Sequence, residues 1–312
     1  MPINVRPVVP SRIVSGLFSH ESRRTPGSII GGYIALTKPR IIELLLVTTV
    51  PTMVLAAGKW PSWSLIAVTL LGGTLAAGGA NAINMYIDRD IDKLMKRTQT
   101  RPLVTGLIAP KNALVFALAL EVVAFAVLWF GANLLSALLA LSATAFYVFI
   151  YSMWLKRTSK QNIVIGGAAG AVPTLIGWSA VTNSVGWPAV WLFIIIFLWT
   201  PPHFWALAIR HADEYRAAKV PMLPSVVSIE RTVRTMVVYT VVLAMATLVL
   251  IPVAGLGWIY SASAVVLGLG FIIGTAMLGH KPTEAWSMRV FSFSITYVTL
   301  LFGALMVDVL LS

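Results

Sequence analysis

Residues 62–92 read SWSLIAVTLLGGTLAAGGANAINMYIDRDID, and this stretch decides the fold class. Its first part is an apolar run long enough to cross a membrane as a helix, which takes about 20 residues. Its last part carries Asn84, Asp88 and Asp92 at positions i, i+4 and i+8. On a helix this spacing places the three side chains on one face, about 6 Å apart, whereas Asp90 falls on the opposite side. The stretch therefore predicts a membrane helix that ends in an acidic face.

The rest of the chain is similarly apolar. Of 312 residues, 58% are hydrophobic and only 11% are charged, whereas a soluble domain has about 25% charged residues. Cysteine is absent, which excludes a disulfide framework, a thiolate zinc site and a cysteine nucleophile. We therefore expect an all-α polytopic membrane protein with nine transmembrane helices, at approximately 41–58, 62–87, 113–130, 132–151, 163–182, 186–209, 233–253, 258–279 and 289–311.

Basic residues are distributed unevenly between the loops that join these segments. Of the 23 lysines and arginines, 22 fall on one side of the membrane and only Lys59 falls on the other. Because basic loops stay on the cytoplasmic side, we expect a cytoplasmic N-terminus and an outside C-terminus, in a bacterial cytoplasmic (inner) membrane. Topology also explains the formal charge of +12, so no nucleic-acid partner is expected.

The N-terminal stretch differs from the remainder in composition. Residues 1–28 contain several arginines and prolines and no sustained apolar core, which argues against a signal peptide. We expect a flexible cytoplasmic arm there, followed by a single nine-helix domain over residues 29–312.

The acidic face has the chemistry of a magnesium site. Carboxylate and amide oxygens are hard ligands that suit Mg²⁺, which commonly bridges carboxylates to substrate phosphates. The alternative is a solvated helix end whose carboxylates pair with neighbouring basic residues. Asn84 argues against it, because this residue lies one turn deeper in the membrane and in line with Asp88 and Asp92.

This motif, followed by Arg97-Thr98 and Arg101-Pro102, resembles the first signature of the UbiA family of intramembrane prenyltransferases. The resemblance implies a nine-helix bundle around a central cavity that opens to the cytoplasmic side. It also implies that Asn84, Asp88 and Asp92 hold Mg²⁺, or Mn²⁺ in its place, on the diphosphate of a prenyl donor, and that Arg97 and Arg101 bind the same diphosphate.

A second motif, YSMWLKRTSKQNIVIGG, covers residues 151–167. Its Tyr151, Lys156 and Arg157 are candidates for binding the departing diphosphate. Ordinary cytoplasmic anchoring explains the same residues equally well from physics alone. The family resemblance favours the diphosphate role and adds Lys156 to the catalytic residues, with Asp88 and Asp92.

A third motif, WTPPHFWALAIRHADEYRAAKVPMLP, covers residues 199–224. Pro201 and Pro202 are expected to break or kink the sixth helix. Asp213 and Glu214 form a second acidic cluster and are additional candidate metal ligands. Other UbiA members carry a full Asp-rich motif here, whereas this chain has Ile209 where the first aspartate would be, which puts a complete second metal site in doubt.

The string PPHFWALA closely resembles the protohaem IX farnesyltransferase branch of the family, and the likeness extends over about residues 30–305. It implies a prenyl transferase that moves a farnesyl group from farnesyl diphosphate to a vinyl group of haem b, with addition of water, giving haem O and diphosphate. Haem b is then a substrate rather than a cofactor, with His203 and Arg210 as candidate haem-binding residues. Helix packing is the alternative role for His203. Expected partners are the two substrates, the lipid bilayer, and haem A synthase or terminal-oxidase assembly factors.

Two other functions remain open from the residues. One is prenyl transfer to an aromatic quinone precursor, and the other is cation-coupled transport through the acidic face. Glu43, Glu121 and Asp308 lie inside predicted membrane helices, where we expect them to make hydrogen bonds between helices.

Overall fold

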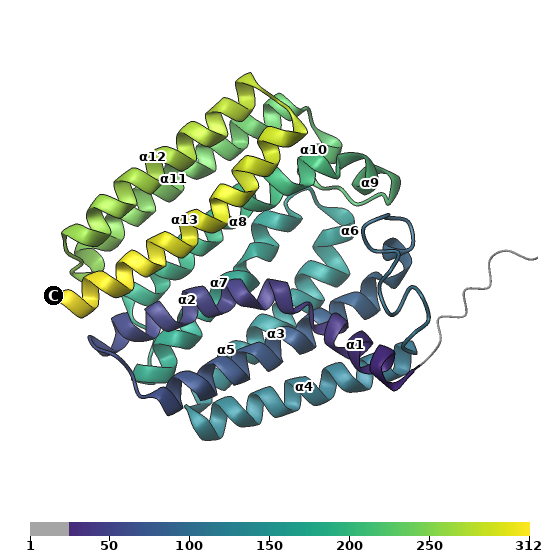
Figure 1. Ribbon diagram of the computed structural model, residues 1–312, viewed down its shortest axis with the longest axis horizontal. Helices are drawn as coiled ribbons and strands as arrows, with labels where there is room; N and C mark the ends of the chain where they lie inside the picture. Colours follow the sequence, from purple (N-terminus) through teal and green to yellow (C-terminus); the bar gives the residue numbers. More distant parts are fainter. Residues whose placement is uncertain (1–24) are drawn as a thin grey trace, which may run out of the picture.

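The computed structural model describes residues 25–312, apart from the side chains of residues 40–46, and all regular secondary structure in this part of the chain is helical (Figure 1). The helices are α1 (Pro26–Thr37), α2 (Pro39–Ala57), α3 (Trp63–Asp92), α4 (Pro110–Gly131), α5 (Leu134–Ala145), the π-helix η1 (Phe146–Leu155), α6 (Lys156–Thr158), α7 (Asn162–Thr182), α8 (Trp187–Arg210), α9 (Ala212–Ala217), α10 (Leu223–Val226), α11 (Ile229–Ala254), α12 (Trp258–His280) and α13 (Glu284–Leu311).

Eight helical stretches in the described residues are long and apolar enough to cross a membrane. They are α3, α4, the continuous run Leu134–Thr158, α7, α8, α11, α12 and α13. The predicted first crossing at 41–58 corresponds to α2, whose apolar part is described only over Val47–Ala57. The chain is thus an integral membrane protein with a helical bundle, and the ninth crossing stays a prediction.

The first helix begins before residue 28, where the predicted N-terminal arm ends. Helix α1 begins at Pro26, where Thr25 caps it by accepting a hydrogen bond from the Ser28 backbone N–H at 3.2 Å. The last residues of the predicted 1–28 arm are therefore helical, and residues 1–24 lie outside the described residues.

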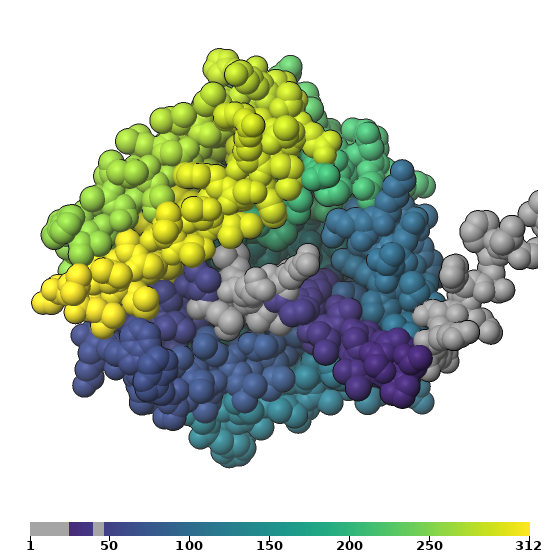
Figure 2. Space-filling model, viewed as in Figure 1, coloured from purple at the N-terminus to yellow at the C-terminus, as the bar shows by residue number. Residues whose placement is uncertain are grey.

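Two groups of helices make up the bundle, and α2 and α7 lie between them (Figure 1). In one group, α8, α11, α12 and α13 pack around a large aromatic and aliphatic core that includes Trp205, Tyr260, Phe271 and Tyr297. Figure 2 shows α13 running across this face of the molecule with α12 beside it. In the other group, α3 packs against α4, and α5 packs against both α4 and α7. The two groups enclose the cavity described below.

Helix α3 is 30 residues long and carries the acidic face to its last turn. It begins at the cap residue Ser62, whose hydroxyl accepts a hydrogen bond from the Leu65 backbone N–H at 3.3 Å. Alanine and glycine line its buried middle part, so neighbouring helices approach closely. Because the helix continues without a break through Asp92, the spacing seen in the sequence becomes a real alignment of side chains.

A π-helix follows α5 without interruption. Over Phe146–Leu155 the backbone bonds run from i to i+5, and the wider turn brings Tyr147 and Tyr151 into a stack with ring centroids 5.2 Å apart. Ser152 donates a hydrogen bond to the Tyr147 carbonyl at 2.9 Å. π-helical turns are frequent at functional sites, and this one places its aromatic side chains and the following Lys156 beside the acidic end of α3.

Of the two effects predicted for the double proline, a break or a kink, the break is wrong, because α8 remains helical through Pro201 and Pro202, and the kink stays a prediction. Neighbouring contacts hold this part of the helix. Trp199 donates from its indole nitrogen to the Ser294 carbonyl at 2.8 Å, which ties α8 to α13 directly beside the prolines. Thr200 donates its hydroxyl proton to the Ile196 carbonyl at 2.8 Å.

The two intramembrane acids with described side chains both bridge helices. Glu121 of α4 accepts a hydrogen bond from Thr144 of α5 at 3.2 Å. Asp308 of α13 accepts from the backbone N–H groups of Gly257, Ile259 and Tyr260, at 2.5, 3.0 and 3.1 Å. These donors form the first turn of α12, which has no helical acceptor for them, so Asp308 caps a neighbouring helix. The side chain of Glu43 lies outside the described residues.

Replacing Asp308 with alanine is expected to lower the free energy of unfolding by about 1–3 kcal/mol, because three backbone N–H groups lose their acceptor. Thermal unfolding in detergent measures the change as a lower melting temperature, with Asp308→Asn giving an intermediate value. A wild-type melting temperature for Asp308→Ala would contradict the capping role.

Candidate active site

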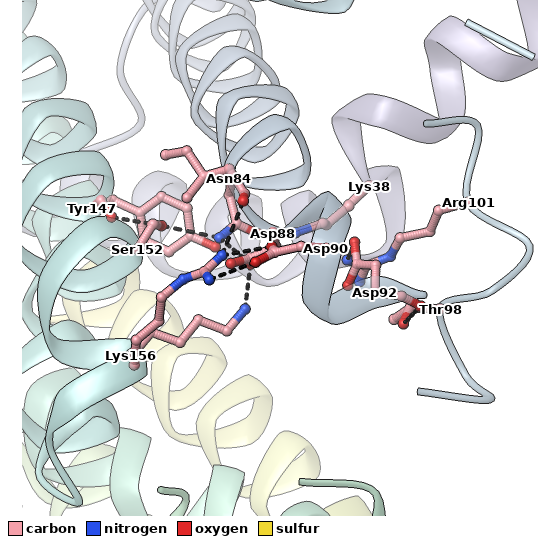
Figure 3. Close-up of polar contacts among 12 residues, drawn as sticks. Lys38, Asn84, Asp88, Asp90, Asp92, Thr98, Arg101, Tyr147, Ser152 and Lys156 are labelled. Carbon is pink, nitrogen blue, oxygen red and sulfur yellow. Dashed lines mark hydrogen bonds and ion pairs between the residues drawn. The ribbon is translucent and has the colours of Figure 1, made fainter. Parts of the chain in front are cut away.

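The acidic end of α3 meets three other parts of the chain (Figure 3). Lys38 comes from the junction of α1 and α2, Ser152 and Lys156 come from η1 and α6, and Arg101 comes from the loop after α3. Figure 3 shows these side chains converging on two groups, one around Asn84 and Asp88 and one around Asp92.

The first group is a chain of hydrogen bonds. Lys38 donates from Nζ to Asn84 Oδ1 at 2.8 Å. Asn84 in turn donates from Nδ2 to Asp88 Oδ2 at 2.8 Å and to Ser152 Oγ at 3.0 Å. Lys156 forms an ion pair with the same Asp88 Oδ2. Each of these two α3 side chains thus contacts an ammonium group, Asn84 that of Lys38 and Asp88 that of Lys156. These partners come from other parts of the chain and orient the two side chains.

The contacts of Asp88 described above use only one of its two carboxylate oxygens, Oδ2. Its side chain is 0% exposed, and Oδ1 has no hydrogen-bond partner among the residues that the structure describes. A buried carboxylate oxygen without a partner is costly. A divalent cation is a suitable partner for this oxygen, and with Asn84 and Asp92 nearby the donor set consists of hard oxygens. The residues present therefore fit a Mg²⁺-type metal.

The second group lies one turn further along α3. Arg101 donates from a guanidinium nitrogen to Asp92 Oδ2 at 2.6 Å. Thr98 donates its hydroxyl proton to the Asp92 backbone carbonyl at 2.8 Å, which folds the loop back onto the helix end. The sequence pattern of Arg97-Thr98 and Arg101-Pro102 thus has a local structural role, because it returns Arg101 to the acidic face.

Asp90 and Arg157 form a separate pair outside the cavity. Two guanidinium nitrogens of Arg157 donate to the two carboxylate oxygens of Asp90, each at 2.7 Å, and the pair is partly exposed. The structure does not bring the predicted diphosphate residue Arg157 together with Asp88 and Asp92. The physical reason is that Asp90 sits on the opposite face of α3 and offers Arg157 a bidentate partner.

A cavity of about 350 Å³ begins at the acidic face and extends into the membrane part of the bundle. Tyr147 and Tyr151 line it beside the polar end, and alanines and glycines of α3, α5 and α7 line the deeper part. The basic residues at its polar end are Lys38, Arg97, Arg101 and Lys156.

Positive charge exceeds negative charge at this polar end, where four basic residues and one carboxylate, Asp92, line the cavity. Asp88 lies buried behind this lining, paired with Lys156. Burial, together with the charges of Arg101 and Lys156, lowers the pKa of Lys38 to about 7, and Asp88 and Asp92 oppose this shift. A nearby anion stabilises the protonated form of a lysine whose pKa is lowered in this way. The arrangement can therefore hold a polyanion at its mouth and an apolar chain behind it.

The second acidic cluster lies apart from the first. Asp213 pairs with Arg216 at 2.5 Å on the surface. Glu214 accepts from His211 at 3.2 Å and from the Arg97 backbone N–H at 3.4 Å. Neither lines the cavity, and the described side chains include no group of three or more His, Cys, Asp or Glu residues placed to hold a metal. Glu214 instead supports the loop that carries Arg97.

The two predicted haem contacts also lie away from the cavity wall. His203 is 7% exposed, hydrogen-bonds through Nδ1 to Ser294 Oγ at 2.6 Å, and lies between the rings of Trp199 and Phe291. Arg210 is about half exposed and pairs with Glu284 at 2.7 Å. His203 thus takes part in the packing of α8 against α13.

Three residues of the site were not predicted from the sequence. In the sequence, Lys38 is only one of the basic residues that indicate topology. No sequence pattern predicts the left-handed backbone (φ 53°) that Lys38 adopts just before a proline. Ser152 is an ordinary hydroxyl until the π-helix turns it towards Asn84. Tyr215 lines the cavity from α9, and its place beside the acidic pair was the only available signal.

Comparison with known proteins agrees with this geometry. Residues 45–305 match the model of the UbiA prenyltransferase family. A protoheme IX farnesyltransferase of Paenarthrobacter aurescens is 53% identical over 281 residues, which is 88% of each chain. One of Parafrankia sp. is 54% identical over 282 residues, 89% of this chain and 90% of that one.

Solved structures share the fold at low sequence identity. A digeranylgeranylglyceryl phosphate synthase superposes with a TM-score of 0.75 at 16% identity, over 91% of this chain and 100% of the other. A UbiA homolog from Archaeoglobus fulgidus, bound to GPP and Mg²⁺, superposes with a TM-score of 0.59 at 16% identity, over 88% and 99%. Together with the family match and the close relatives, the likeness shows that this chain belongs to the UbiA prenyltransferase family.

Proposed function

We propose that this chain transfers a farnesyl group from farnesyl diphosphate to a vinyl group of haem b, with addition of water, to give haem O and diphosphate. The single observation that carries the proposal is the cavity with a cationic, oxygen-lined mouth and an apolar interior. The names of relatives more than 50% identical over most of the chain support haem as the acceptor and make an aromatic quinone precursor or cation transport less suitable.

Residues at the mouth receive the diphosphate in this proposal. Asn84, Asp88 and Asp92 would hold Mg²⁺, or Mn²⁺ in its place, which supplies charge neutralisation of the leaving group. Lys38, Arg97, Arg101 and Lys156 supply further positive charge that is already in place before the reaction. Binding of the anion also favours the protonated form of Lys38, because it offsets the repulsion from Arg101 and Lys156.

The bond changes of the proposed reaction follow from the position of the diphosphate at the cavity mouth. The bond between farnesyl carbon C1 and the diphosphate oxygen breaks, and the electron pair leaves with the diphosphate. The faces of Tyr147 and Tyr151 stabilise the allylic cation. The vinyl π electrons form the new carbon–carbon bond, water adds to the resulting cation, and one proton is released to solvent.

The acceptor site and cellular setting complete the proposal. Arg210 stays the predicted partner of a haem propionate, since its exposed ion pair with Glu284 is weak and replaceable. His203 stays a predicted haem contact that would first have to leave Ser294. Asp213, Glu214 and Arg157 stay predictions as well. We place the protein in the bacterial cytoplasmic membrane with its N-terminus inside, and we expect haem A synthase or oxidase assembly factors to receive the product.

Purified protein in lipid vesicles tests the proposed reaction. With farnesyl diphosphate, haem b and Mg²⁺ we expect haem O by mass spectrometry and an equal amount of released diphosphate, and removal of the metal by EDTA should stop both. Parallel reactions contain 4-hydroxybenzoate in place of haem b. A prenylated benzoate, or no prenylated product with either acceptor, would overturn the proposal.

A further inference from the structure

We propose that Thr144 of α5 binds the water that adds to the haem-derived cation, and that Glu121 of α4 receives the proton which this water loses. Thr144 touches the reacting water, whereas Glu121 is a positioning residue that orients Thr144 and acts through it. The inference rests on the proposed farnesyl transfer to haem b and adds the groups that complete its hydration step. It gives a role to an intramembrane acid that the bond changes above leave unused.

Glu121 is a buried acid in the middle of α4, and its carboxyl group lies against α3. The residue is 8% exposed. A Cβ placed on Gly79 would lie 2.6 Å from Glu121 Oε1, so the absence of a side chain at Gly79 leaves the space that this oxygen occupies. The next residue of α3, Ala80, lines the cavity. An ionisable residue inside a membrane bundle is costly to bury and commonly marks a proton pathway or a substrate site.

Thr144 connects this carboxyl group to the cavity. Its hydroxyl group donates to Glu121 Oε1 at 3.2 Å, and the residue lines the cavity. Because the one hydroxyl proton is given to Glu121, the hydroxyl oxygen offers its lone pairs to a donor in the cavity, such as water. Thr69 and Thr200 also line the cavity, but their hydroxyl groups donate to backbone carbonyls of their own helices, at 2.7 and 2.8 Å. A proton passed to Thr144 therefore has a carboxylate to reach.

The pair lies close to the level at which the carbon–oxygen bond of the donor breaks. Thr144 precedes Tyr147 by three residues, which is roughly 4.5 Å towards the interior of the bundle at the helical rise. On α3, Gly79 lies roughly 7.5 Å to the interior of Asn84. Tyr147 and Asn84 mark the polar end of the cavity, where the proposed reaction places farnesyl carbon C1. A water molecule bound to Thr144 is thus within one or two helical turns of the carbon that it must attack.

The hydration step balances through this pair. A lone pair of the water oxygen forms the bond to the cationic carbon of the former vinyl group. One water proton passes to Thr144 Oγ1, while the proton of the Thr144 hydroxyl group passes to Glu121 Oε1. The carboxylate becomes a carboxylic acid, and its proton reaches solvent when the product leaves and water refills the cavity. The positive charge of the neighbouring cation favours the ionised carboxylate at the step that needs it.

Two substitutions test the pair through the composition of the product. Glu121→Gln keeps an oxygen that accepts the hydrogen bond from Thr144 but is too weak a base to take up the proton. Thr144→Val keeps the size of the side chain and removes the hydroxyl group. In both variants the cation should instead lose a proton from the adjacent carbon, which gives a farnesylated haem that lacks the added water. We expect the ratio of this dehydrated product to haem O to rise about 10-fold or more.

The assay uses the full chain in lipid vesicles with farnesyl diphosphate, haem b and Mg²⁺, and mass spectrometry quantifies both products. Diphosphate should still be released, because neither residue contacts the mouth of the cavity where the diphosphate is held. Thr144→Ser retains a hydroxyl group and should keep the wild-type product ratio. A purely structural role of the pair would lower both products together and leave their ratio unchanged.

Two matched controls change the same chemical groups elsewhere in the membrane. Asp308→Asn neutralises another intramembrane acid, which caps α12 and does not line the cavity. Thr299→Val removes the hydroxyl group of an exposed threonine on α13. Both should keep the wild-type ratio of dehydrated product to haem O.

The product ratio also decides against the proposal. If the wild-type protein makes haem O but either Glu121→Gln or Thr144→Val turns over with the wild-type ratio, the pair does not serve the hydration step. Should one of these two variants fail to insert in the membrane, the other gives the answer. If the wild-type protein makes no farnesylated haem of either kind, the proposed function itself fails.

Discussion

Asp88→Asn is expected to lower farnesyl transfer by roughly 10³-fold while leaving the protein inserted in the membrane and folded. Asp88 is 0% exposed, and its Oδ1 has no hydrogen-bond partner among the described residues. The substitution keeps the shape of the side chain and removes its negative charge, so the anchor for a divalent cation is lost. Transfer to haem b in vesicles at increasing Mg²⁺ concentration measures the effect.

Asp90→Asn is the matched control for this experiment. Asp90 lies two residues away on the same helix, but its carboxylate is largely exposed and pairs with Arg157. Its substitution should leave turnover within about twofold of wild type, because an exposed ion pair contributes little. More than a tenth of wild-type activity in Asp88→Asn, or equal losses in the two variants, would remove Asp88 from the proposed metal site.

Lys156→Gln is expected to reduce both turnover and stability. Lys156 is the ammonium partner of the fully buried Asp88, so its loss leaves a buried negative charge without its cation, at a cost of about 3 kcal/mol or more. Turnover should fall by roughly 10²-fold or more, because the leaving diphosphate also loses one cation. Thermal unfolding and farnesyl transfer, measured on the same preparation, give the two effects.

The double variant Asp88→Asn with Lys156→Gln separates these effects. Two neutral amides can hydrogen-bond to each other, so most of the lost stability should return while activity stays absent. Lys160→Gln, in the exposed part of the same loop, serves as the control and should resemble wild type in both measurements. Normal turnover in Lys156→Gln would sink the proposed role of this lysine at the diphosphate.

The acidic face could be predicted from sequence because it is a local feature of one helix. The spacing of Asn84, Asp88 and Asp92 fixes their alignment once the helix is continuous, and α3 is continuous to Asp92. The partners could not be predicted in the same way. Lys38 reaches Asn84 from 46 positions away in the sequence, and such contacts depend on how helices pack rather than on any local pattern.

Other contacts that the sequence did not reveal have the same cause. Arg157 has the residue type for a diphosphate site, but in the structure it pairs with Asp90 on the opposite face of α3. His203 and Ser294 come from different helices, so the sequence could not show that the imidazole is already engaged in packing. The double proline was expected to break or kink α8, and the helix is unbroken there, beside a hydrogen bond from Trp199 to α13.

The excess of basic side chains at the cavity mouth has a further consequence for the catalytic cycle. The charges that attract the donor remain in place after the carbon–oxygen bond breaks, when the diphosphate is free of its apolar chain. Lys38, Arg101 and Lys156 then hold a small, more highly charged anion than before. We therefore expect release of diphosphate, rather than bond cleavage, to set the pace of turnover, and inorganic diphosphate to act as a competitive product inhibitor.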